Sequence, residues 1–316
     1  MTEDMKYCFG VDIGGTTVKL GLFTAEGELI EKWEIPTRRE RHGESVPGDI
    51  SKAILDRMNS RSISKADVIG VGIGVPGPVT PDGTVMKCAN LGWDVMNVNI
   101  VMSEETGLKC VAANDANVAA LGELWRGGAE GFSSMVFITL GTGVGGGIVV
   151  DGKIVHGIHG GGGEIGHILV NPKETALCGC GCRGHLEQYA SATGIVRITK
   201  NALAESDRPS SLRNMESFTA KDIFDAAKAG DELAFESVDT MCAYLAQALS
   251  GVGATIDPEV YVIGGGVAKA GEIITDNVRK HFEESNLNVL RGREFKLAKL
   301  GNDAGIIGAA LLCVND

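Results

Sequence analysis

The sequence predicts an α/β protein of two domains with mainly parallel connections between its strands. Apolar runs of strand length alternate along the chain with segments of helical periodicity. A strand–turn–strand pattern occurs twice, about 130 residues apart, which is typical of a duplicated domain. The length of 316 residues corresponds to about two domains of ordinary size. In folds of this class, ligands bind at the carboxyl ends of strands.

The first half of the chain contains most of the predicted strands. Residues 7–11 form an apolar run that ends in the turn Asp12-Ile-Gly-Gly-Thr-Thr17, and residues 18–23 continue as a second strand. Further strands are expected at 29–35, 68–75 and 108–112, and helices are expected at 48–60 and at 115–126, before Gly127-Gly128.

The opening pattern recurs from residue 135 onward. Residues 135–140 are apolar and end in Gly141-Thr-Gly-Val-Gly-Gly-Gly147, and a strand continues over residues 148–150. The other elements expected here are a loop at 205–216, an amphipathic helix at 232–250, a strand at 259–263 that ends in Gly264-Gly-Gly266, and an apolar helix at 304–312.

Charge and composition argue against several kinds of partner. The chain has 29 basic and 41 acidic residues, so its net charge is -12. An acidic surface repels phosphate backbones, and no basic run suggests an anionic membrane, so we expect neither a nucleic-acid nor a membrane partner. No apolar run reaches the ~18 residues of a membrane helix. The first residues lack the pattern of a secretion signal, and the predicted location is cytoplasmic.

The first glycine turn has the composition of a phosphate-binding loop. Its glycines let backbone N–H groups point at anionic oxygens, and its threonines and lysine add further donors. Asp12 is unsuited to phosphate itself but suits the water around Mg²⁺. The residues predicted to contact the nucleotide or its Mg²⁺ here are Asp12, Gly14, Gly15, Thr16, Thr17 and Lys19.

Two further glycine turns follow predicted strands. Gly141, Thr142 and Gly143 can hold a second part of the phosphate chain, and the flat, uncharged turn of Gly264, Gly265 and Gly266 suits a nucleoside. Any one of these turns is equally compatible with a tight hairpin, but three of them at strand ends favour nucleotide binding. The chain has no P-loop motif, and no G-x-G-x-x-G follows its first strand, which argues against a Rossmann site.

Asp115 lies where a predicted strand passes into a helix, a position that suits a side chain directed into a cleft. Phosphoryl transfer requires an acceptor for the proton of the attacking hydroxyl, and a carboxylate can be that acceptor. The alternative is a helix N-cap, for which both Asn114 and Asp115 are suitable residues.

Cysteines are concentrated in one short segment. Of the eight in the chain, Cys178, Cys180 and Cys182 lie within five positions, and His185 follows three positions after Cys182. Closely spaced cysteines make a poor disulfide framework but, with histidine, a good tetrahedral Zn²⁺ site. A buried, inert role is the alternative for any single cysteine.

Seven motifs together resemble the ROK family of sugar kinases, within the hexokinase/actin-like ATPase superfamily. They are DIGGTTVK, VGIGVPGPV, NDANVAALGE, LGTGVGGGI, GGGGEIGHI, CGCGCRGHLEQYASATG and VIGGGV, and they cover essentially the whole chain. The resemblance, which is greatest to the bacterial glucokinase branch, implies two actin-like (ribonuclease H-like) α/β domains with ATP and sugar in the cleft between them. It implies a small domain of residues 1–115 with helix 303–316 packed back on it, and a large domain of residues 116–302 that carries the zinc site.

The resemblance also implies roles for individual residues. Asp115 would be the general base for the sugar 6-hydroxyl. The sugar would be bound by Asn114, Asp115, Glu164, His167 and Glu187, with Gly77 and Asn90 as weaker assignments. Structural zinc would be held by His167, Cys178, Cys180 and His185. The chain departs from the family pattern here, because His185 stands where the family has its third cysteine, so Cys182 remains an alternative fourth ligand.

The implied activity is ATP-dependent phosphorylation of a hexose, with glucose as the first choice of substrate and ATP, Mg²⁺ and structural Zn²⁺ as the cofactors. The alternatives left open are N-acetylmannosamine, N-acetylglucosamine, fructose or allose as the sugar, and polyphosphate as the donor. A non-catalytic sugar-binding regulator is a further alternative, although repressors of this family carry a DNA-binding segment before the first glycine turn, which begins here at residue 12. We expect a homodimer or a homotetramer.

Overall fold

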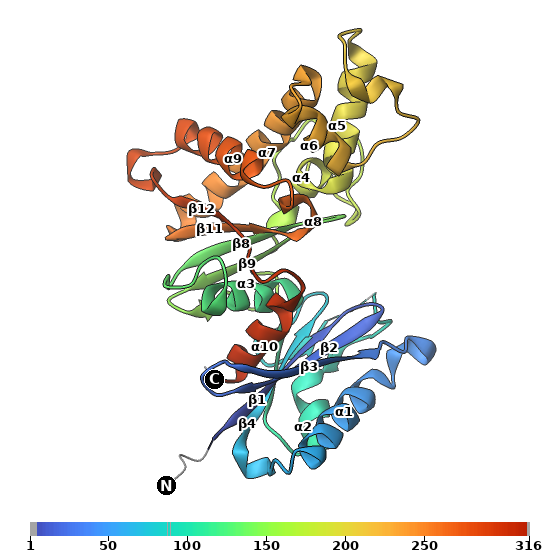
Figure 1. Cartoon of the computed structure of the whole chain (residues 1–316), viewed down its shortest axis with the longest axis vertical. Coiled ribbons are helices and arrows are strands. Elements are labelled where there is room, and N and C mark those ends of the chain that lie inside the picture. The colour runs from blue at the N-terminus through green and yellow to red at the C-terminus, as the bar shows by residue number, and fades with distance from the viewer. Residues whose placement is uncertain (1–4, 87, 89, 315–316) are drawn as a thin grey trace. The chain divides into compact units, whose positions relative to one another are not determined.

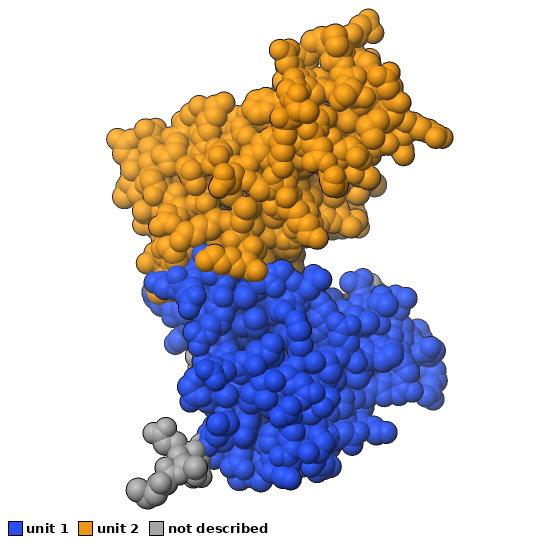
Figure 2. Space-filling view, in the orientation of Figure 1, with its two compact units in different colours: residues 1–131, 147–163, 300–316 blue, residues 132–146, 164–299 orange. Residues whose placement is uncertain are grey.

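A computed structural model describes residues 5–86, 88 and 90–314 of the chain. The chain divides into two compact units (Figure 2). Unit 1 contains residues 1–131, 147–163 and 300–316, and unit 2 contains residues 132–146 and 164–299.

The first sheet has five strands in the order β3-β2-β1-β4-β7. Its strands are β1 (Tyr7–Ile13), β2 (Thr17–Thr24), β3 (Leu29–Pro36), β4 (Val68–Val75) and β7 (Cys110–Asn114). β1, β2 and β3 pair in antiparallel fashion, whereas β4 is parallel to both β1 and β7. One face of this sheet packs with α1 (Val46–Ser60) and α2 (Val98–Thr106) around a core that includes Phe9, Leu20, Ile50, Ile54 and Ile73.

The second sheet repeats this plan in the order β10-β9-β8-β11-β12. Its strands are β8 (Met135–Leu140), β9 (Val144–Val150), β10 (Lys153–Ile154), β11 (Val260–Gly264) and β12 (Glu294–Leu297). β11 is parallel to both β8 and β12, and β10 is antiparallel to β9. The shared strand order confirms the α/β fold and agrees with the duplication that the sequence predicts.

The remaining elements are mainly helices (Figure 1). They are α3 (Asp115–Arg126), α4 (Glu187–Ala190), α5 (Ala192–Glu205), α6 (Ala220–Lys228), α7 (Glu232–Ile256), α8 (Gly265–Ala268), α9 (Glu272–Ser285) and α10 (Ala304–Val314), with a small hairpin of β5 (Thr84–Val85) and β6 (Met96–Asn97). Among the described residues, no helix has both the length and the apolar character that a bilayer crossing requires.

Helices α3 and α10 pack side by side in unit 1 (Figure 1). Gly308 meets α3 so closely that a Cβ atom there would lie 1.6 Å from the carbonyl oxygen of Val118. A Cβ at Gly122 would similarly lie 2.3 Å from the carbonyl oxygen of Ala304. Only glycine permits this approach, so the two helices form a tightly packed pair.

The observed elements differ from the predicted ones in several places. The loop expected at 205–216 contains a 3-10 turn over Ser211–Asn214, and Gly145–Gly147 belong to strand β9 instead of the turn. The units also divide the chain differently from the predicted boundary at residue 115. Residues 116–131 belong to unit 1, because α3 packs on α10.

Candidate active site

The first glycine turn connects β1 to β2 and is held by backbone hydrogen bonds. The Gly14 amide donates to the Thr17 carbonyl at 3.0 Å, and the Thr37 hydroxyl donates to the Gly14 carbonyl at 2.7 Å. A side chain at Gly14 would collide with the Thr17 carbonyl, whereas Gly15 has open space around it. Thr16 is exposed at the tip of the turn. The turn is therefore fixed at its base and accessible at its tip, as a phosphate loop requires.

Asp12 and Lys19 are paired across β1 and β2, directly below this turn. Burial raises the pKa of the Asp12 carboxyl, and the positive charge of Lys19 partly opposes that effect. The Lys19 ammonium donates to the Asn302 carbonyl at 3.1 Å. A largely buried carboxylate next to a glycine turn is suited to binding a hydrated divalent cation, which would replace the lost solvation.

Asn114 and Asp115 lie where β7 passes into α3. The Asn114 side-chain oxygen accepts hydrogen bonds from the amides of Ala116 and Asn117, at 2.9 and 3.1 Å. Its side-chain amide donates to the Gly77 carbonyl at 3.1 Å. Asn114 is thus the helix N-cap and also fixes the turn that follows β4. The capping role that the sequence allowed for either residue is thus performed by Asn114, and Asp115 follows it as the first residue of the helix.

Asp115 is the first residue of α3 and is partly exposed. One of its carboxylate oxygens accepts from the Ala116 amide at 2.8 Å. Burial raises the pKa of the Cys88 thiol, and the negative charge of Asp115 raises it further. The exposed Asn90 follows Cys88 in a short turn, so unit 1 brings Gly77, Asn90 and Asn114 into the surroundings of Asp115.

The second glycine turn connects β8 to β9 and, unlike the first, is contacted by the carboxylate of a glutamate. The Gly141 amide donates to the Gly143 carbonyl at 2.9 Å, and the Ala192 amide donates to the Gly141 carbonyl at 2.8 Å. The carboxylate of Glu187 reaches the turn from α4 and accepts from the Val144 amide at 3.2 Å. A Cβ at Gly143 would lie 2.2 Å from that carboxylate, so glycine at this position makes room for Glu187. Thr142 is exposed at the tip.

The third glycine turn is not the flat turn that the sequence predicts. Gly264 ends β11, and Gly265 and Gly266 begin the single helical turn of α8. Gly265 has φ +85° and lies so close to β8 that a Cβ would be 2.4 Å from the Leu140 carbonyl oxygen. Only glycine can adopt this φ value and also lie this close to the backbone of β8. The conformation of Gly265 therefore explains why glycine occurs here, and a flat surface for a nucleoside is not needed to explain it.

The predicted metal ligands His167, Cys178, Cys180 and His185 come together in unit 2. Their ligand atoms all lie within 4.8 Å of one another. The Nδ1 atoms of His167 and His185 are 3.3 Å apart, and the Cys180 sulfur is 3.3 Å from the Nδ1 of His185. Zinc bonds of 2.0–2.3 Å place tetrahedral ligands about 3.3–3.8 Å from one another, so these residues fit that ion.

Cys182 is not part of this group, although its backbone supports the same loop. Its carbonyl accepts from the Cys178 amide at 2.7 Å. A hydrogen bond from the Cys182 backbone is the largest of the effects that lower the pKa of the Cys180 thiol. Burial, by contrast, raises the pKa of the Cys178 thiol. The geometry therefore favours His185 over Cys182 as the fourth ligand.

The predicted sugar-binding residues of unit 2 surround this cluster. The Nε2 atom of His167 is 4.0 Å from the Glu164 carboxylate. The other oxygen of Glu187 lies 3.6 Å from the Cys178 sulfur. Glu164 and Glu187 are thus neighbours of the four-residue cluster, and His167 is one of its members.

A polar network that the sequence did not indicate anchors the cysteine loop. The Glu174 carboxylate accepts from the Tyr189 hydroxyl at 2.6 Å and from Arg197 at 2.7 Å, and Asn171 donates to the Tyr189 oxygen at 2.9 Å. The Tyr189 hydroxyl is the main cause that lowers the pKa of Glu174 to about 2. The residues are 15 to 23 positions apart along the chain, and no local pattern predicts such contacts.

The model of the ROK family matches residues 8–316. The chain belongs to the ROK family. It is 44% identical over 312 residues to a glucokinase of Halalkalibacterium halodurans, with 97% of this chain and 94% of the relative covered. It is similar to the crystal structure of a ROK hexokinase from Thermus thermophilus, with a TM-score of 0.79, 30% identity and 97% of each chain covered.

A second solved structure of the family contains a sugar and a nucleotide analogue. The ROK family glucokinase of Streptomyces griseus, in complex with glucose and AMPPNP, has a TM-score of 0.72 and 32% identity to this chain. The alignment covers 98% of this chain and 100% of that one. These similarities confirm the predicted family and the actin-like fold, since both structures cover nearly the full length of this chain.

Proposed function

We propose that this protein phosphorylates glucose at its 6-hydroxyl with ATP as the donor, and that Asp115 is the general base. The observation that carries the proposal is the start of α3, where Asn114 caps the helix and fixes the Gly77 turn while Asp115 supplies a carboxylate. The family relationship to glucokinases supports the choice of sugar.

In this mechanism, a bond forms between the sugar oxygen and the γ-phosphorus of ATP, and the bond from that phosphorus to the β,γ-bridging oxygen breaks. Asp115 accepts the proton of the 6-hydroxyl as the oxygen attacks, and ADP leaves. Asn114 and the Gly77 turn position the sugar. Glu164 and Glu187 accept hydrogen bonds from its hydroxyls, His167 donates one through the ring nitrogen that is not assigned to the metal, and Asn90 is an additional contact.

The glycine turns position the donor. The Gly14–Thr17 turn and the Gly141–Gly143 turn supply backbone N–H groups and threonine hydroxyls for the phosphate chain, and Gly264–Gly266 adjoin the nucleoside. Asp12 would hold hydrated Mg²⁺, and Lys19 lies beside Asp12 across the two strands. Mg²⁺, when bound with ATP, neutralises the charge that develops on the transferring phosphoryl group.

We propose further that His167, Cys178, Cys180 and His185 hold a structural Zn²⁺. Four protein ligands leave no open position for substrate, so the ion supplies a fixed cross-link within the loop. The Glu164 carboxylate near His167 is suited to orient that imidazole as a metal ligand. The consequence for the reaction is that Glu164, His167 and Glu187 are held in place before sugar binds.

A coupled ADP assay with a panel of hexoses tests the function. The panel contains glucose, fructose, allose, N-acetylglucosamine and N-acetylmannosamine, each with Mg-ATP, and polyphosphate replaces ATP in a parallel series. Glucose is expected to give the highest kcat/KM and glucose 6-phosphate as the product. Turnover of an N-acetylated sugar above that of glucose would reassign the substrate, and absence of turnover with every sugar would overturn the proposal.

A further inference from the structure

Glu123 carries a fully buried carboxylate that the proposed reaction does not use. It lies on α3, eight residues after Asp115, and its exposed fraction is 0%. A buried carboxylate is costly unless hydrogen bonds replace its lost hydration. The hydrogen-bond donors that contact Glu123 therefore show which parts of the chain it holds together.

The two oxygens of Glu123 bind backbone segments that are distant in the sequence. One oxygen accepts from the Gly128 amide at 2.7 Å, and the other accepts from the Leu300 amide at 2.9 Å. Gly127 makes room for the carboxylate, because a Cβ there would lie 2.1 Å from one of its oxygens. A single side chain thus fastens both segments to α3.

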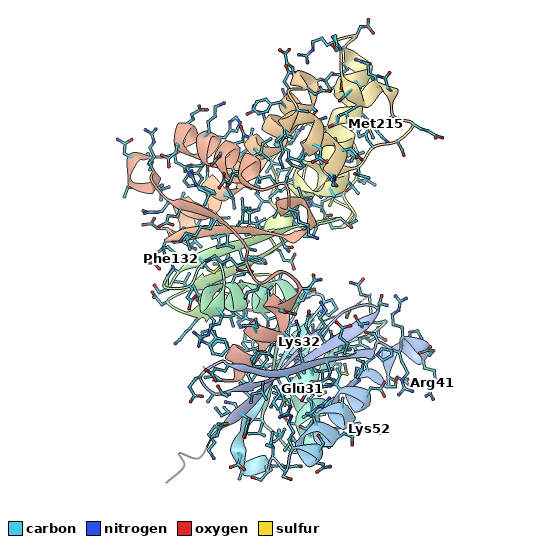
Figure 3. All side chains as sticks on the ribbon, viewed as in Figure 1. Glu31, Lys32, Arg41, Lys52, Phe132 and Met215 are labelled. Atoms are coloured by element: carbon cyan, nitrogen blue, oxygen red, sulfur yellow. The ribbon has the colours of Figure 1, made fainter. Side chains whose placement is uncertain are left out.

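Both segments lie next to places where the chain passes from one unit to the other. The first crossing follows Gly131, and unit 2 begins at Phe132, which is labelled in Figure 3. The chain crosses back to unit 1 at Gly147, leaves it again after Gly163 and makes its last crossing into unit 1 at Leu300. Gly128 is three residues before the first crossing, and Leu300 is the first residue after the last one.

Glu123 lies on α3, which packs tightly against α10. Its neighbour Gly122 is in close contact with the backbone of α10, and Gly308 is in close contact with the backbone of α3. The same helix α3 begins at Asp115, the proposed base. Glu123 therefore connects two crossing segments to a tightly packed helix pair whose other end carries the proposed catalytic carboxylate.

We propose that Glu123 is a positioning residue that anchors the hinge between the two units. Two of the four places where the chain crosses between the units then stay attached to α3, the helix that begins at Asp115, so that any movement during substrate binding starts from the same two attachment points. The inference rests on the proposed kinase function for its kinetic consequence. The two hydrogen bonds from backbone amides to Glu123 do not depend on which substrate the protein binds.

The variant E123Q tests the anchor. Glutamine has the same shape, but its NH2 group faces one of the two backbone N–H donors, so one of the two hydrogen bonds is lost. Hinge changes commonly alter kcat and KM together, and we expect kcat/KM for both glucose and ATP to fall about 10-fold. The control is T106V, which removes another fully buried side-chain hydrogen bond of unit 1, the 2.6 Å bond to the Met102 carbonyl.

Both variants are compared per mole of folded enzyme, well below their melting temperatures. The expected result is a loss of stability in both but altered kinetics only in E123Q. If E123Q has the kcat and KM of the unmodified protein, or if T106V changes them equally, the hinge role is overturned and Glu123 is merely structural. If the unmodified protein has no kinase activity, the kinase proposal is contradicted. The anchor is then tested by amide hydrogen exchange at Gly128 and Leu300.

Amide hydrogen exchange of the unmodified full-length protein keeps the proposal testable if E123Q does not fold. The amides of Gly128 and Leu300 are expected to exchange slowly although they lie outside regular helices and strands, both with and without glucose and an ATP analogue. Rapid exchange at either amide would overturn the anchor.

Discussion

The two sheets share one strand order but differ in what their strand ends carry. The first sheet has Asp12 near the end of β1 and Asp115 directly after β7. At the equivalent places of the second sheet are Thr139 near the end of β8 and Ala298 after β12. The first sheet therefore supplies the carboxylates, and the second supplies backbone amides and hydroxyls.

This contrast has a chemical meaning for phosphoryl transfer. A base and a metal-binding carboxylate are required near the reacting hydroxyl and the phosphates, whereas the phosphate chain itself is repelled by carboxylates. The second turn nevertheless contacts one acid, because Glu187 reaches it from α4. In the proposed mechanism, the first sheet therefore supplies its own carboxylates, whereas the carboxylate next to the second sheet comes from the separate helix α4.

The largest expected effect comes from D115N, which removes the base and leaves the shape unchanged. We expect kcat to fall about 10²–10⁴-fold, because asparagine cannot accept the proton of the attacking hydroxyl. Calorimetric binding of glucose should stay close to that of the unmodified protein. Unchanged turnover would remove Asp115 from the mechanism and with it the catalytic distinction between the two sheets.

The second prediction concerns the turn that Glu187 contacts. G143A places a methyl group where the Glu187 carboxylate lies, so the carboxylate must move away from the Val144 amide. Because Glu187 is also assigned to the sugar, we expect KM for both glucose and ATP to rise, by about 10-fold.

The matched control for this change is G141A in the same turn. A Cβ at Gly141 meets nothing within 4 Å, so this variant adds a methyl group without displacing Glu187. Its KM for glucose should stay within about 2-fold of that of the unmodified protein. Equal effects of the two substitutions would mean that the turn tolerates no side chain at all, and that Glu187 is not the cause.

Strand ends could be predicted from the sequence, whereas contacts between distant segments could not. Asp12, Asp115 and the glycine turns stand next to apolar runs, so local patterning was enough to place them at the ends of strands. The Glu187–Val144 contact joins residues 43 positions apart, and the Glu123–Leu300 contact joins residues 177 apart. Such contacts depend on the packing of whole elements.

Some missed elements did have a local signal. The helix α6 begins with a capping box in which Thr219 and Asp222 bind each other's backbone amides. The Ser/Thr-x-x-Asp/Glu spacing is visible in the sequence and would have predicted the start of this helix. The third glycine turn shows the opposite case, because the φ value of +85° at Gly265 and its approach to β8 appear only in the folded chain.

The third prediction separates the two possible fourth ligands of the metal cluster. H185A should lose most of the bound zinc and lower the melting temperature, because one of the four converging ligand atoms disappears. C182S should keep about one zinc ion per chain, since Cys182 lies outside the cluster. Metal content by mass spectrometry and thermal unfolding measure both effects, and the opposite result would assign the site to Cys182.

The smallest expected effect is on the pH dependence of stability, and it contrasts two carboxyl groups. Glu174 in unit 2 has its pKa lowered to about 2, chiefly by the Tyr189 hydroxyl, whereas burial raises the pKa of Asp12 in unit 1. A lowered pKa contributes stability that is complete above the unfolded value of ~4.3 and is lost as the pH falls toward 2. A raised pKa acts in the opposite direction, so acidification relieves the cost of burying the Asp12 charge.

The variant E174Q isolates the first of these two contributions. The difference in unfolding free energy between E174Q and the unmodified protein should be constant from pH 8 to about pH 5.5 and should shrink below about pH 4. Urea unfolding at a series of pH values measures this difference, and D12N measured in parallel should show the reverse slope. If the E174Q difference already shrinks between pH 7 and pH 5.5, then Tyr189 and Arg197 do not hold Glu174 as an ion, and the cysteine loop is anchored in another way.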